Sequence, residues 1–199
     1  DEVVVNESID QTRSHVVFLQ DSETGLFRHI IREISPGHYE WRDANFWGRG
    51  NGWAMACLVD QMEMIEGMPS QASNFQFLNS TLNKLVANLT PLQDSSSGLW
   101  HTLLTDDDSY LETSCSALFA YAIGKAVNHS WIAPDNATVA INAFKGILNR
   151  VSPNGVLTWV SGGTGEHPET VPRFDTAISW GQGIFLKCYR FFSHYQWEW

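Results

Sequence analysis

Two hydrophobic patterns alternate along this chain. The first pattern spaces apolar residues three or four positions apart, as in a helix that buries one face and exposes the other. It occurs within residues 5–19, 75–89 and 139–148. The second pattern places apolar residues on nearly every side of a helix, which is typical of a buried helix. It covers residues 54–65, 117–127 and 183–192.

One-sided and all-round apolar helices therefore alternate three times, which predicts three stacked helical hairpins with an outer and an inner layer. The predicted fold is all-α with only short strand-like loops, and residues 1–199 form a single domain. An array of three hairpins leaves an apolar inner helix open at each end, so it needs a cap, closure into a ring or a partner. We expect the chain to be about half of a larger closed structure.

A short repeated unit precedes each of the three inner helices. A polar turn leads to a glycine and one or two apolar residues, and a loop of variable length follows. The glycines are Gly25, Gly98 and Gly155. Variable loops on a regular scaffold commonly carry function on one face. We expect Ser109 or Thr113 to cap the second inner helix.

The composition excludes several classes of protein. Hydrophobic residues make up 43% of the chain, enough for a sizeable core, so a disordered protein is excluded. The formal net charge of −10 argues against nucleic acid and membranes as partners. No apolar run approaches the roughly 20 residues that span a bilayer, and no signal peptide is recognisable. Because the chain begins with Asp1 rather than Met, we expect a preceding segment.

Glycosylation sequons indicate a secreted glycoprotein. Five Asn-x-Ser/Thr sequons occur, at Asn6, Asn79, Asn88, Asn128 and Asn136. Composition alone accounts for roughly two, so chance is the alternative. Three cysteines lie far apart in apolar helical stretches, at Cys57, Cys115 and Cys188. We expect buried free thiols, with a single disulfide as the alternative.

The densest group of candidate binding residues is the string from Phe46 to Trp53, which reads Phe-Trp-Gly-Arg-Gly-Asn-Gly-Trp. Its three alternating glycines let a backbone approach a ligand closely. Trp47 and Trp53 offer ring faces and Arg49 offers a fixed pair of donors, which together suit a carbohydrate with a carboxylate. A glycine-rich turn with core tryptophans is the structural alternative. The spacing differs from that of a phosphate-binding loop.

Further candidates occupy the other repeated units. His29 ends the first unit, where its loop rejoins the scaffold near the string, and His101 has the analogous place in the second unit. His29 is a candidate polar contact or proton relay, with an ordinary loop histidine as the alternative. In the third unit, Trp180 is a candidate stacking residue and Gln182 a candidate partner of a sugar hydroxyl. Packing is the equal alternative for both.

Carboxylates near the predicted inner helices are candidate general acids. Asp43, Glu112 and Asp175 each lie just before or at such a helix, but a cap or loop role is favoured for all three. The run Asp106–Asp108 is expected to support a helix N-terminus. Neither His-x-x-x-His nor Glu-x-x-His spacing occurs, so no metal site is expected.

Four stretches resemble glycoside hydrolase families 105 and 88, the unsaturated rhamnogalacturonyl and unsaturated glucuronyl hydrolases. They are Glu-Thr-Gly-Leu-Phe-Arg-His at 23–29, the string at 46–53, Ser-Tyr-Leu-Glu-Thr-Ser at 109–114 with its following helix, and Ser-Trp-Gly-Gln-Gly at 179–183. The Trp-Gly-Arg-Gly-Asn-Gly-Trp string is the specific part. The order and spacing are similar to those in the C-terminal half of a typical family member.

This resemblance implies an (α/α)6 toroid of six helical hairpins, of which the chain would supply three. It also implies removal of a 4,5-unsaturated uronyl sugar from fragments of pectin or related polysaccharides. In that family an aspartate protonates the C4=C5 double bond, and water adds there rather than at the anomeric carbon, without a cofactor. By the same resemblance, Arg49 binds the uronate carboxylate. Trp47 and Trp53 line the sugar subsite, and His29 contacts the unsaturated sugar.

The chain departs from the family in one respect. The family's catalytic aspartate lies upstream of the histidine-bearing loop, and no matching segment precedes His29. We expect this acid upstream of residue 1. The expected partners are an anionic oligosaccharide and either the missing N-terminal half or a second copy of the chain. The alternative is a non-catalytic carbohydrate-binding or assembly protein without the aspartate. A lyase or epimerase on a helical toroid fits the string less well.

Overall fold

The computed structural model describes residues 2–43, 45–163, 171–195 and 197. Helices dominate the described part of the chain. They are α1 (Glu2–Leu19), α2 (Gly48–Ile65), α3 (Ala72–Leu89), α4 (Thr113–Asn128), α5 (Asn136–Leu148) and α6 (Ser179–His194). Single 3-10 turns lie at Pro69–Gln71 and Thr90–Leu92. Each predicted helical stretch falls within or nearly within one of these six helices, so the predicted all-α hairpin fold is confirmed.

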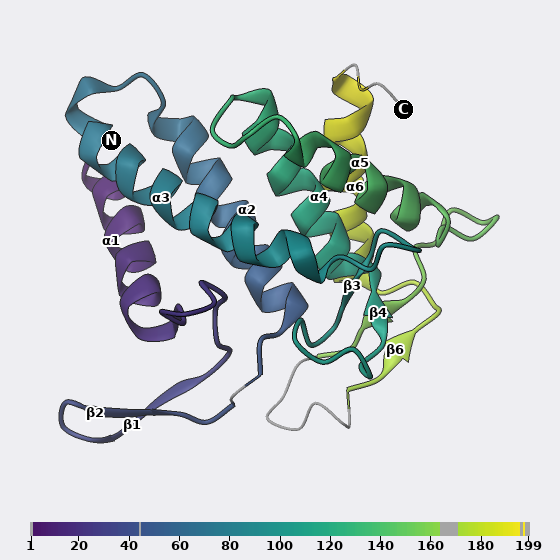
Figure 1. The fold of residues 1–199 in the computed structure, drawn as a ribbon, viewed down its shortest axis with the longest axis horizontal. Helices are drawn as coiled ribbons and strands as arrows, with labels where there is room; N and C mark the ends of the chain where they lie inside the picture. Colours follow the sequence, from purple (N-terminus) through teal and green to yellow (C-terminus); the bar gives the residue numbers. More distant parts are fainter. Residues whose placement is uncertain (1, 44, 164–170, 196, 198–199) are drawn as a thin grey trace.

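The helices form two layers (Figure 1). Helices α2, α4 and α6 are the inner helices, and α1, α3 and α5 precede them as outer helices. Helix α4 is at the centre, because it packs against α2 on one side, α6 on the other and α5 behind. Every residue from Thr113 to Ala126 of α4 is buried, as its all-round apolar pattern predicts.

The predicted burial on all sides is wrong for one side of α2 and for one side of α6. Met64 of α2 is 58% exposed, and Leu186 and Tyr189 of α6 are 63% and 49% exposed. These helices are the two edges of the inner layer, and within the described residues no further inner helix packs against them. Their apolar surface is therefore the open surface that three unclosed hairpins must leave.

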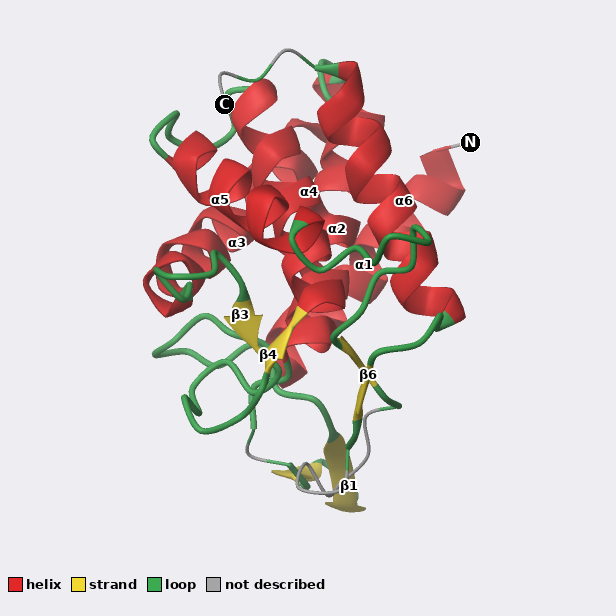
Figure 2. Ribbon diagram, turned by 90° about the vertical axis from the view of Figure 1, so that its right-hand side faces the viewer, coloured by secondary structure: helices red, strands yellow, loops and turns green. Residues whose placement is uncertain are grey.

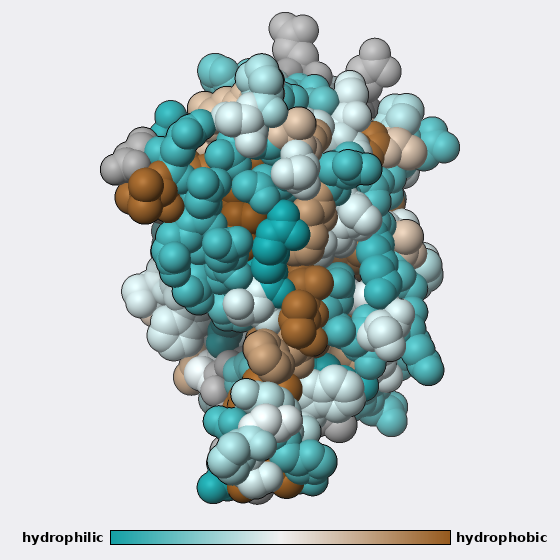
Figure 3. All heavy atoms as spheres, turned by 90° about the vertical axis from the view of Figure 1, so that its left-hand side faces the viewer, coloured by the Kyte–Doolittle hydropathy of each residue, from teal (hydrophilic) through white to brown (hydrophobic). Residues whose placement is uncertain are grey.

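The outer helix α1 packs less tightly than the others. Ile9 is its only buried residue, whereas Val3, Val4 and Val17 are 75%, 66% and 75% exposed. Figure 3 views the side of the molecule on which α1 lies, and apolar side chains interrupt its hydrophilic surface. Part of the contact with α2 is polar, because Gln61 accepts a hydrogen bond from Thr12 and donates to Ser8.

Strands are short and gather at one end of the helices (Figure 2), as the sequence predicts. Three antiparallel pairs occur in the described residues: β1 (Ile31–Ser35) with β2 (His38–Trp41), β3 (Trp100–His101) with β4 (Leu111–Glu112), and β5 (Val160–Ser161) with β6 (Arg173–Phe174). The β1–β2 hairpin is the longest and projects from the helical body. The inner helices begin at this end.

One hydrogen-bonding device occurs in all three repeats. The glycine of each polar turn has positive φ: +69° at Gly25, +75° at Gly98 and +78° at Gly155. The residue two positions later is bound by the fourth residue of the next inner helix. Asn51 binds both the N–H and the C=O of Phe27, Gln182 does the same at Leu157, and Ser116 accepts from the N–H of Trp100. We call these three contacts the strand clamps.

The cap of α4 is neither Ser109 nor Thr113, but it agrees with the cap or loop role that the sequence favours for Glu112. Glu112 is the N-cap, and its carboxylate accepts from the backbone N–H groups of Ser114 at 2.8 Å and Cys115 at 2.6 Å. Neither Ser109 nor Thr113 serves as the cap, because Ser109 binds Leu103 and Thr113 is already inside the helix. The expected support of a helix N-terminus by Asp106–Asp108 is also wrong, because these residues form an exposed turn between β3 and β4.

No disulfide joins the three cysteines. Cys115 and Cys188 are buried as predicted, and burial raises the pKa of both thiols. Cys57 is exposed, contrary to the prediction, because it lies on the open side of α2. Among the described residues, no helix is both long and apolar enough to cross a membrane.

Candidate binding site

The glycines of the 46–53 string serve mainly helix packing. A Cβ on Gly48 would lie 2.9 Å from the Cys115 Sγ, and a Cβ on Gly52 would lie 2.8 Å from Leu118 atoms. Both glycines therefore let α2 approach α4 closely. Gly50 is exposed, with nothing nearer than 3.8 Å to such a Cβ, so only this glycine offers backbone access to a ligand.

A cavity of about 460 Å³ lies between α1, the segment 27–29 and the first half of α2. We call it the α1–α2 cavity. It brings together three of the sequence-predicted site residues: His29, Trp47 and Trp53. Its other lining residues are Ser8, Gln11, Thr12, His15, Leu19, Phe27, Arg28, Gly50, Ala54, Cys57, Leu58 and Gln61.

The two tryptophans of this cavity present different amounts of surface. Trp53 is 51% exposed, so a ring face is open to a ligand. Trp47 is 1% exposed and packs with Leu103 and Val171. The ring of Trp47 lies edge-on to that of His29, with the centroids 5.8 Å apart. Trp47 therefore lines the cavity as part of its wall, whereas Trp53 has the geometry of a stacking surface.

A buried carboxylate lies behind His29 and Trp47. Asp43 is 4% exposed, and its Oδ2 accepts a 2.5 Å hydrogen bond from the Trp47 Nε1. The same oxygen is 3.6 Å from the Nδ1 of His29. Burial alone raises the pKa of Asp43, but hydrogen bonds from Trp47 and Asn45 and the nearby His29 outweigh it and hold the pKa below its ordinary value. Asp43 is therefore ionised at neutral pH.

Arg49 belongs to a second group, at the start of α2 and beside β5. Its guanidinium donates to the carbonyls of Ser161 at 2.8 Å and Gly162 at 2.5 Å, and to the Ser161 hydroxyl at 2.6 Å. The indole of Trp180 lies 5.6 Å from the guanidinium and donates to the same Ser161 carbonyl. Three acceptors thus fix the guanidinium beside an aromatic ring.

The position of Ser161 depends on Glu112. This glutamate is fully buried, and besides capping α4 it accepts from the backbone N–H of Ser161 at 3.0 Å. A chain of contacts therefore runs from the α4 N-terminus through Ser161 to Arg49. Sequence reasoning missed this chain, because Arg49 and Ser161 are 112 residues apart and no local pattern links them.

The remaining candidates have structural roles. Gln182 uses its amide oxygen and one amide N–H on the backbone of Leu157 as a strand clamp, which is the packing role given as its alternative. The Nδ1 of His101 binds the Ser109 carbonyl, and the Asp175 carboxylate accepts from the Trp159 N–H. The contact of Asp175 agrees with the cap or loop role that the sequence favours for it.

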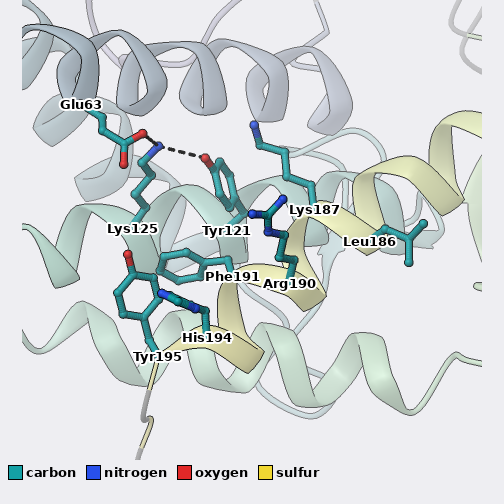
Figure 4. Close-up of a pocket in the computed structure, with 9 residues that line it drawn as sticks. All are labelled: Glu63, Tyr121, Lys125, Leu186, Lys187, Arg190, Phe191, His194 and Tyr195. Atoms are coloured by element: carbon teal, nitrogen blue, oxygen red, sulfur yellow. Dashed lines mark hydrogen bonds and ion pairs between the residues drawn. The ribbon is translucent and has the colours of Figure 1, made fainter.

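A charged cluster occupies the opposite half of the inner helices (Figure 4). It lines a second cavity, of about 590 Å³. The Nζ of Lys125 donates to Asp60 at 2.8 Å, Glu63 at 2.7 Å and the Tyr121 hydroxyl at 3.0 Å, and Lys187 also binds Asp60 at 2.8 Å. Burial lowers the pKa of Lys125, but its carboxylate partners outweigh this and raise the pKa above its ordinary value.

This cluster joins α2, α4 and α6 through residues more than 60 positions apart. No sequence pattern predicts it. Within the described residues, no group of three or more His, Cys, Asp or Glu side chains is placed to hold a metal ion.

The fold is an array of helical hairpins with two groups of candidate site residues near the starts of its inner helices, and the comparison with known families assigns it to the glycoside hydrolases. Residues 1–191 match the family model described as Glycosyl Hydrolase Family 88, and the chain belongs to that family. The resemblance inferred from the 46–53 string is therefore confirmed.

Several named relatives match along most of the chain. The chain is 32% identical over 188 residues to the unsaturated rhamnogalacturonyl hydrolase YesR of Bacillus subtilis (strain 168), covering 90% of this chain and 50% of that protein. It is 27% identical to an unsaturated 3S-rhamnoglycuronyl hydrolase of Formosa agariphila, covering 84% of this chain and 45% of that protein. The chain thus spans about half the length of these curated relatives.

Solved structures give the same result for the fold. A possible family 105 member from Salmonella enterica serovar Paratyphi A matches with a TM-score of 0.84 and 37% identity, over 92% of this chain and 48% of that one. A family 105 hydrolase of C. acetobutylicum matches with a TM-score of 0.78 at 23% identity, over 98% and 59% of the chains. These proteins are (α/α)6 toroids, and three hairpins correspond to about half of such a ring.

Proposed function

We propose that the protein containing this chain hydrolyses 4,5-unsaturated uronyl oligosaccharides derived from pectin or related polysaccharides, by hydration of the C4=C5 bond. The proposal is supported by membership of Glycosyl Hydrolase Family 88 and by the named activities of the relatives. The observation that carries it is the guanidinium of Arg49, which three acceptors hold beside the Trp180 ring. A fixed guanidinium is suited to binding a sugar carboxylate.

In this proposal each site residue has a distinct role. Arg49 binds the uronate carboxylate, and the exposed ring of Trp53 stacks on the sugar. His29 contacts the sugar from the α1–α2 cavity. The catalytic aspartate comes from a segment that precedes residue 1 and completes the ring, because a second copy of residues 1–199 would lack it as well. No cofactor is part of the proposal.

A second function has one specific observation in its favour. The two buried carboxylates next to the site, Asp43 and Glu112, each accept several hydrogen bonds from the scaffold. Neither is arranged as a free general acid. A non-catalytic carbohydrate-binding or assembly protein that retains the Arg49 site is therefore the alternative.

Secretion and N-glycosylation are also part of the proposal. All five sequon asparagines lie on helices of the described chain. Asn128, at the end of α4, is exposed, whereas Asn88 and Asn136 donate their side-chain amides to backbone carbonyls. Asn6 of α1 is exposed as well, but its side-chain oxygen already accepts from Gln71, so Asn128 is the sequon that we favour for occupancy.

The experiment that tests the function is replacement of Arg49 in the native protein, including any segment that precedes residue 1. We expect Arg49→Ala to lower kcat/KM on unsaturated uronides about 10²-fold, because a charge-assisted pair at the substrate carboxylate is lost. Loss of alkene ultraviolet absorbance measures turnover. Arg32→Ala, on the exposed strand β1, is the matched control and is expected to leave turnover unchanged.

Two outcomes would contradict the proposal. Unchanged kinetics in Arg49→Ala would remove the carboxylate-binding role of Arg49. A native protein without turnover that still binds unsaturated uronides by calorimetry, with binding lost in Arg49→Ala, would favour the non-catalytic alternative.

A further inference from the structure

Asp43 is far more buried than a carboxylate in a loop usually is. It lies between the end of β2 (His38–Trp41) and the start of α2, yet its side chain is only 2% exposed. Burying an ionised carboxylate costs several kcal/mol unless hydrogen bonds replace water. Here the replacement partners are specific, and two of them belong to the α1–α2 cavity.

The two oxygens of Asp43 have separate tasks. Oδ1 accepts from the backbone N–H of Asn45 at 2.9 Å and from its side-chain amide at 2.7 Å, which shapes the loop. Oδ2 accepts from the Trp47 Nε1 at 2.5 Å and faces the His29 Nδ1 at 3.6 Å. Oδ1 therefore stabilises the loop conformation, whereas Oδ2 contacts two residues that line the α1–α2 cavity.

We propose that Asp43 is a positioning residue of the α1–α2 cavity: its Oδ2 fixes the Trp47 indole and keeps the proton of neutral His29 on Nδ1. The role in sugar binding rests on the proposed function, whereas the effects on the two rings do not.

The physical basis for the second effect is the charge of the carboxylate. A carboxylate beside one ring nitrogen favours the imidazole tautomer that carries the proton on that nitrogen. With the proton on Nδ1, Nε2 of His29 is the acceptor nitrogen. A histidine held in this form can take a hydrogen bond from a hydroxyl or water, whereas the other tautomer would donate from Nε2.

Other charged groups lie near the histidine but are bound elsewhere. Arg28 pairs with Asp21 at 2.8 Å and lies over the rings of Trp41 and Phe46. His15 lines the same cavity from α1, where its Nδ1 contacts the Gln11 carbonyl. Asp43 is the carboxylate that lies at ion-pair distance from the Nδ1 of His29.

The test uses two replacements of Asp43 and one control. Asp43→Asn removes the negative charge and leaves one acceptor oxygen, which the Trp47 indole can use at the expense of Asn45, and Asp43→Ala removes both oxygens. Asp94→Asn is the control, because Asp94 is a hydrogen-bonded turn carboxylate in the second repeat, away from the cavity. The readout is nitrogen-15 NMR of the native protein at alkaline pH, which reports the His29 tautomer and the Trp47 indole N–H.

We expect neutral His29 to carry its proton on Nδ1 in the wild-type protein and in Asp94→Asn. In Asp43→Asn the proton should move towards Nε2, while the Trp47 indole N–H stays protected from exchange. In Asp43→Ala both signals should change. An Nε2–H tautomer in the wild-type protein, or an unchanged tautomer in Asp43→Asn, would overturn the proposal.

Kinetics separate this inference from the proposed function. On unsaturated uronides we expect Asp43→Asn to lower kcat about 10²-fold with a smaller change in KM, because the ring nitrogen that meets the reacting sugar is altered. A tautomer change in a protein without turnover would uphold the positioning of His29 and count against the hydrolase function. If Asp43→Asn changes the His29 tautomer but keeps full turnover, the tautomer does not matter for the reaction, and that part of the proposal is overturned.

Discussion

Glycine is required at the turn of each repeat by backbone conformation, and at one turn by space as well. All three turn glycines have φ near +70° to +78°, where side chains with a Cβ are strained. A Cβ at Gly98 would also lie 2.3 Å from the Asn142 carbonyl of α5, whereas one at Gly155 would meet nothing within 4 Å. Gly98 is therefore constrained by both backbone conformation and space, whereas Gly155 is constrained by backbone conformation alone.

This difference gives a matched pair of substitutions. Gly155→Ala should destabilise the protein by about 1 kcal/mol, the usual cost of the left-handed conformation for alanine. Gly98→Ala should cost about 3 kcal/mol or more, because α5 must also move away. Denaturant unfolding with a common slope measures both. Equal losses of stability would mean that the second repeat relaxes around the added methyl group.

At the scale of the element, helix α4 depends on a cap that contacts another segment. The Glu112 carboxylate binds two N–H groups at the helix start and the N–H of Ser161 in β5. Hydrophobic periodicity predicted all six helices because packing of an apolar face dominates helix formation. The cap or loop role favoured for Glu112 is confirmed, but its contact with β5, 49 residues away, was not predicted because no local pattern contains it.

Removing this cap should destabilise the fold and also disturb Arg49. We expect Glu112→Ala to lower the free energy of unfolding by about 3 kcal/mol, since buried N–H groups lose their acceptor. Glu112→Gln, which keeps an acceptor oxygen, should lose about half as much. Asp106→Asn, in the exposed turn, is the control. Chemical denaturation measures the stabilities. A free energy of unfolding that is the same in Glu112→Ala as in the wild-type protein would show that water replaces the carboxylate.

At the scale of the molecule, charges hold the inner helices together where the ring is open. Asp60 of α2 binds Lys125 of α4 and Lys187 of α6, so one carboxylate links all three inner helices. Burial raises the pKa of Asp60, but the two lysines outweigh it and lower the pKa below its ordinary value. The cluster therefore stays fully charged around neutral pH.

The stability contribution of this cluster should depend on pH with a defined sign. Because the folded pKa of Asp60 is lowered, its contribution is present above the unfolded pKa of about 3.9 and is lost as the pH falls further. Because the folded pKa of Lys125 is raised, its contribution is present below about pH 10.4 and is lost only as the pH rises beyond that value.

Replacement of the lysine tests this prediction. We expect Lys125→Met to cost about 2 kcal/mol at pH 7, less than for a fully buried pair, because Asp60 and Glu63 are 39% and 53% exposed. The difference from the wild-type protein should shrink below about pH 4. Lys145→Met, on the exposed side of α5, is the control. A loss of stability that is constant from neutral to strongly acidic pH would contradict an ionic contribution.

The sequence predicted more of the fold than of the site. The helices, their layers and the three glycine units follow from local periodicity and turn chemistry. The 46–53 string pointed to Trp47 and Trp53 and the first repeated unit to His29, and the structure places these three residues around one cavity. The burial of Asp43, the three carbonyl and hydroxyl partners of Arg49 and the exposed sides of α2 and α6 depend on tertiary packing, so no local pattern contains them.

The strand clamps also bear on how such repeats diverge. Each clamp binds main-chain atoms, so the bound residue can be Phe, Trp or Leu, and the binding residue needs only a short polar side chain: Asn, Ser or Gln. Selection then constrains one glycine and one polar residue in each repeat, and the other residues of the unit can be substituted more freely. Duplicated units of this kind can lose detectable similarity to one another while they keep the same register.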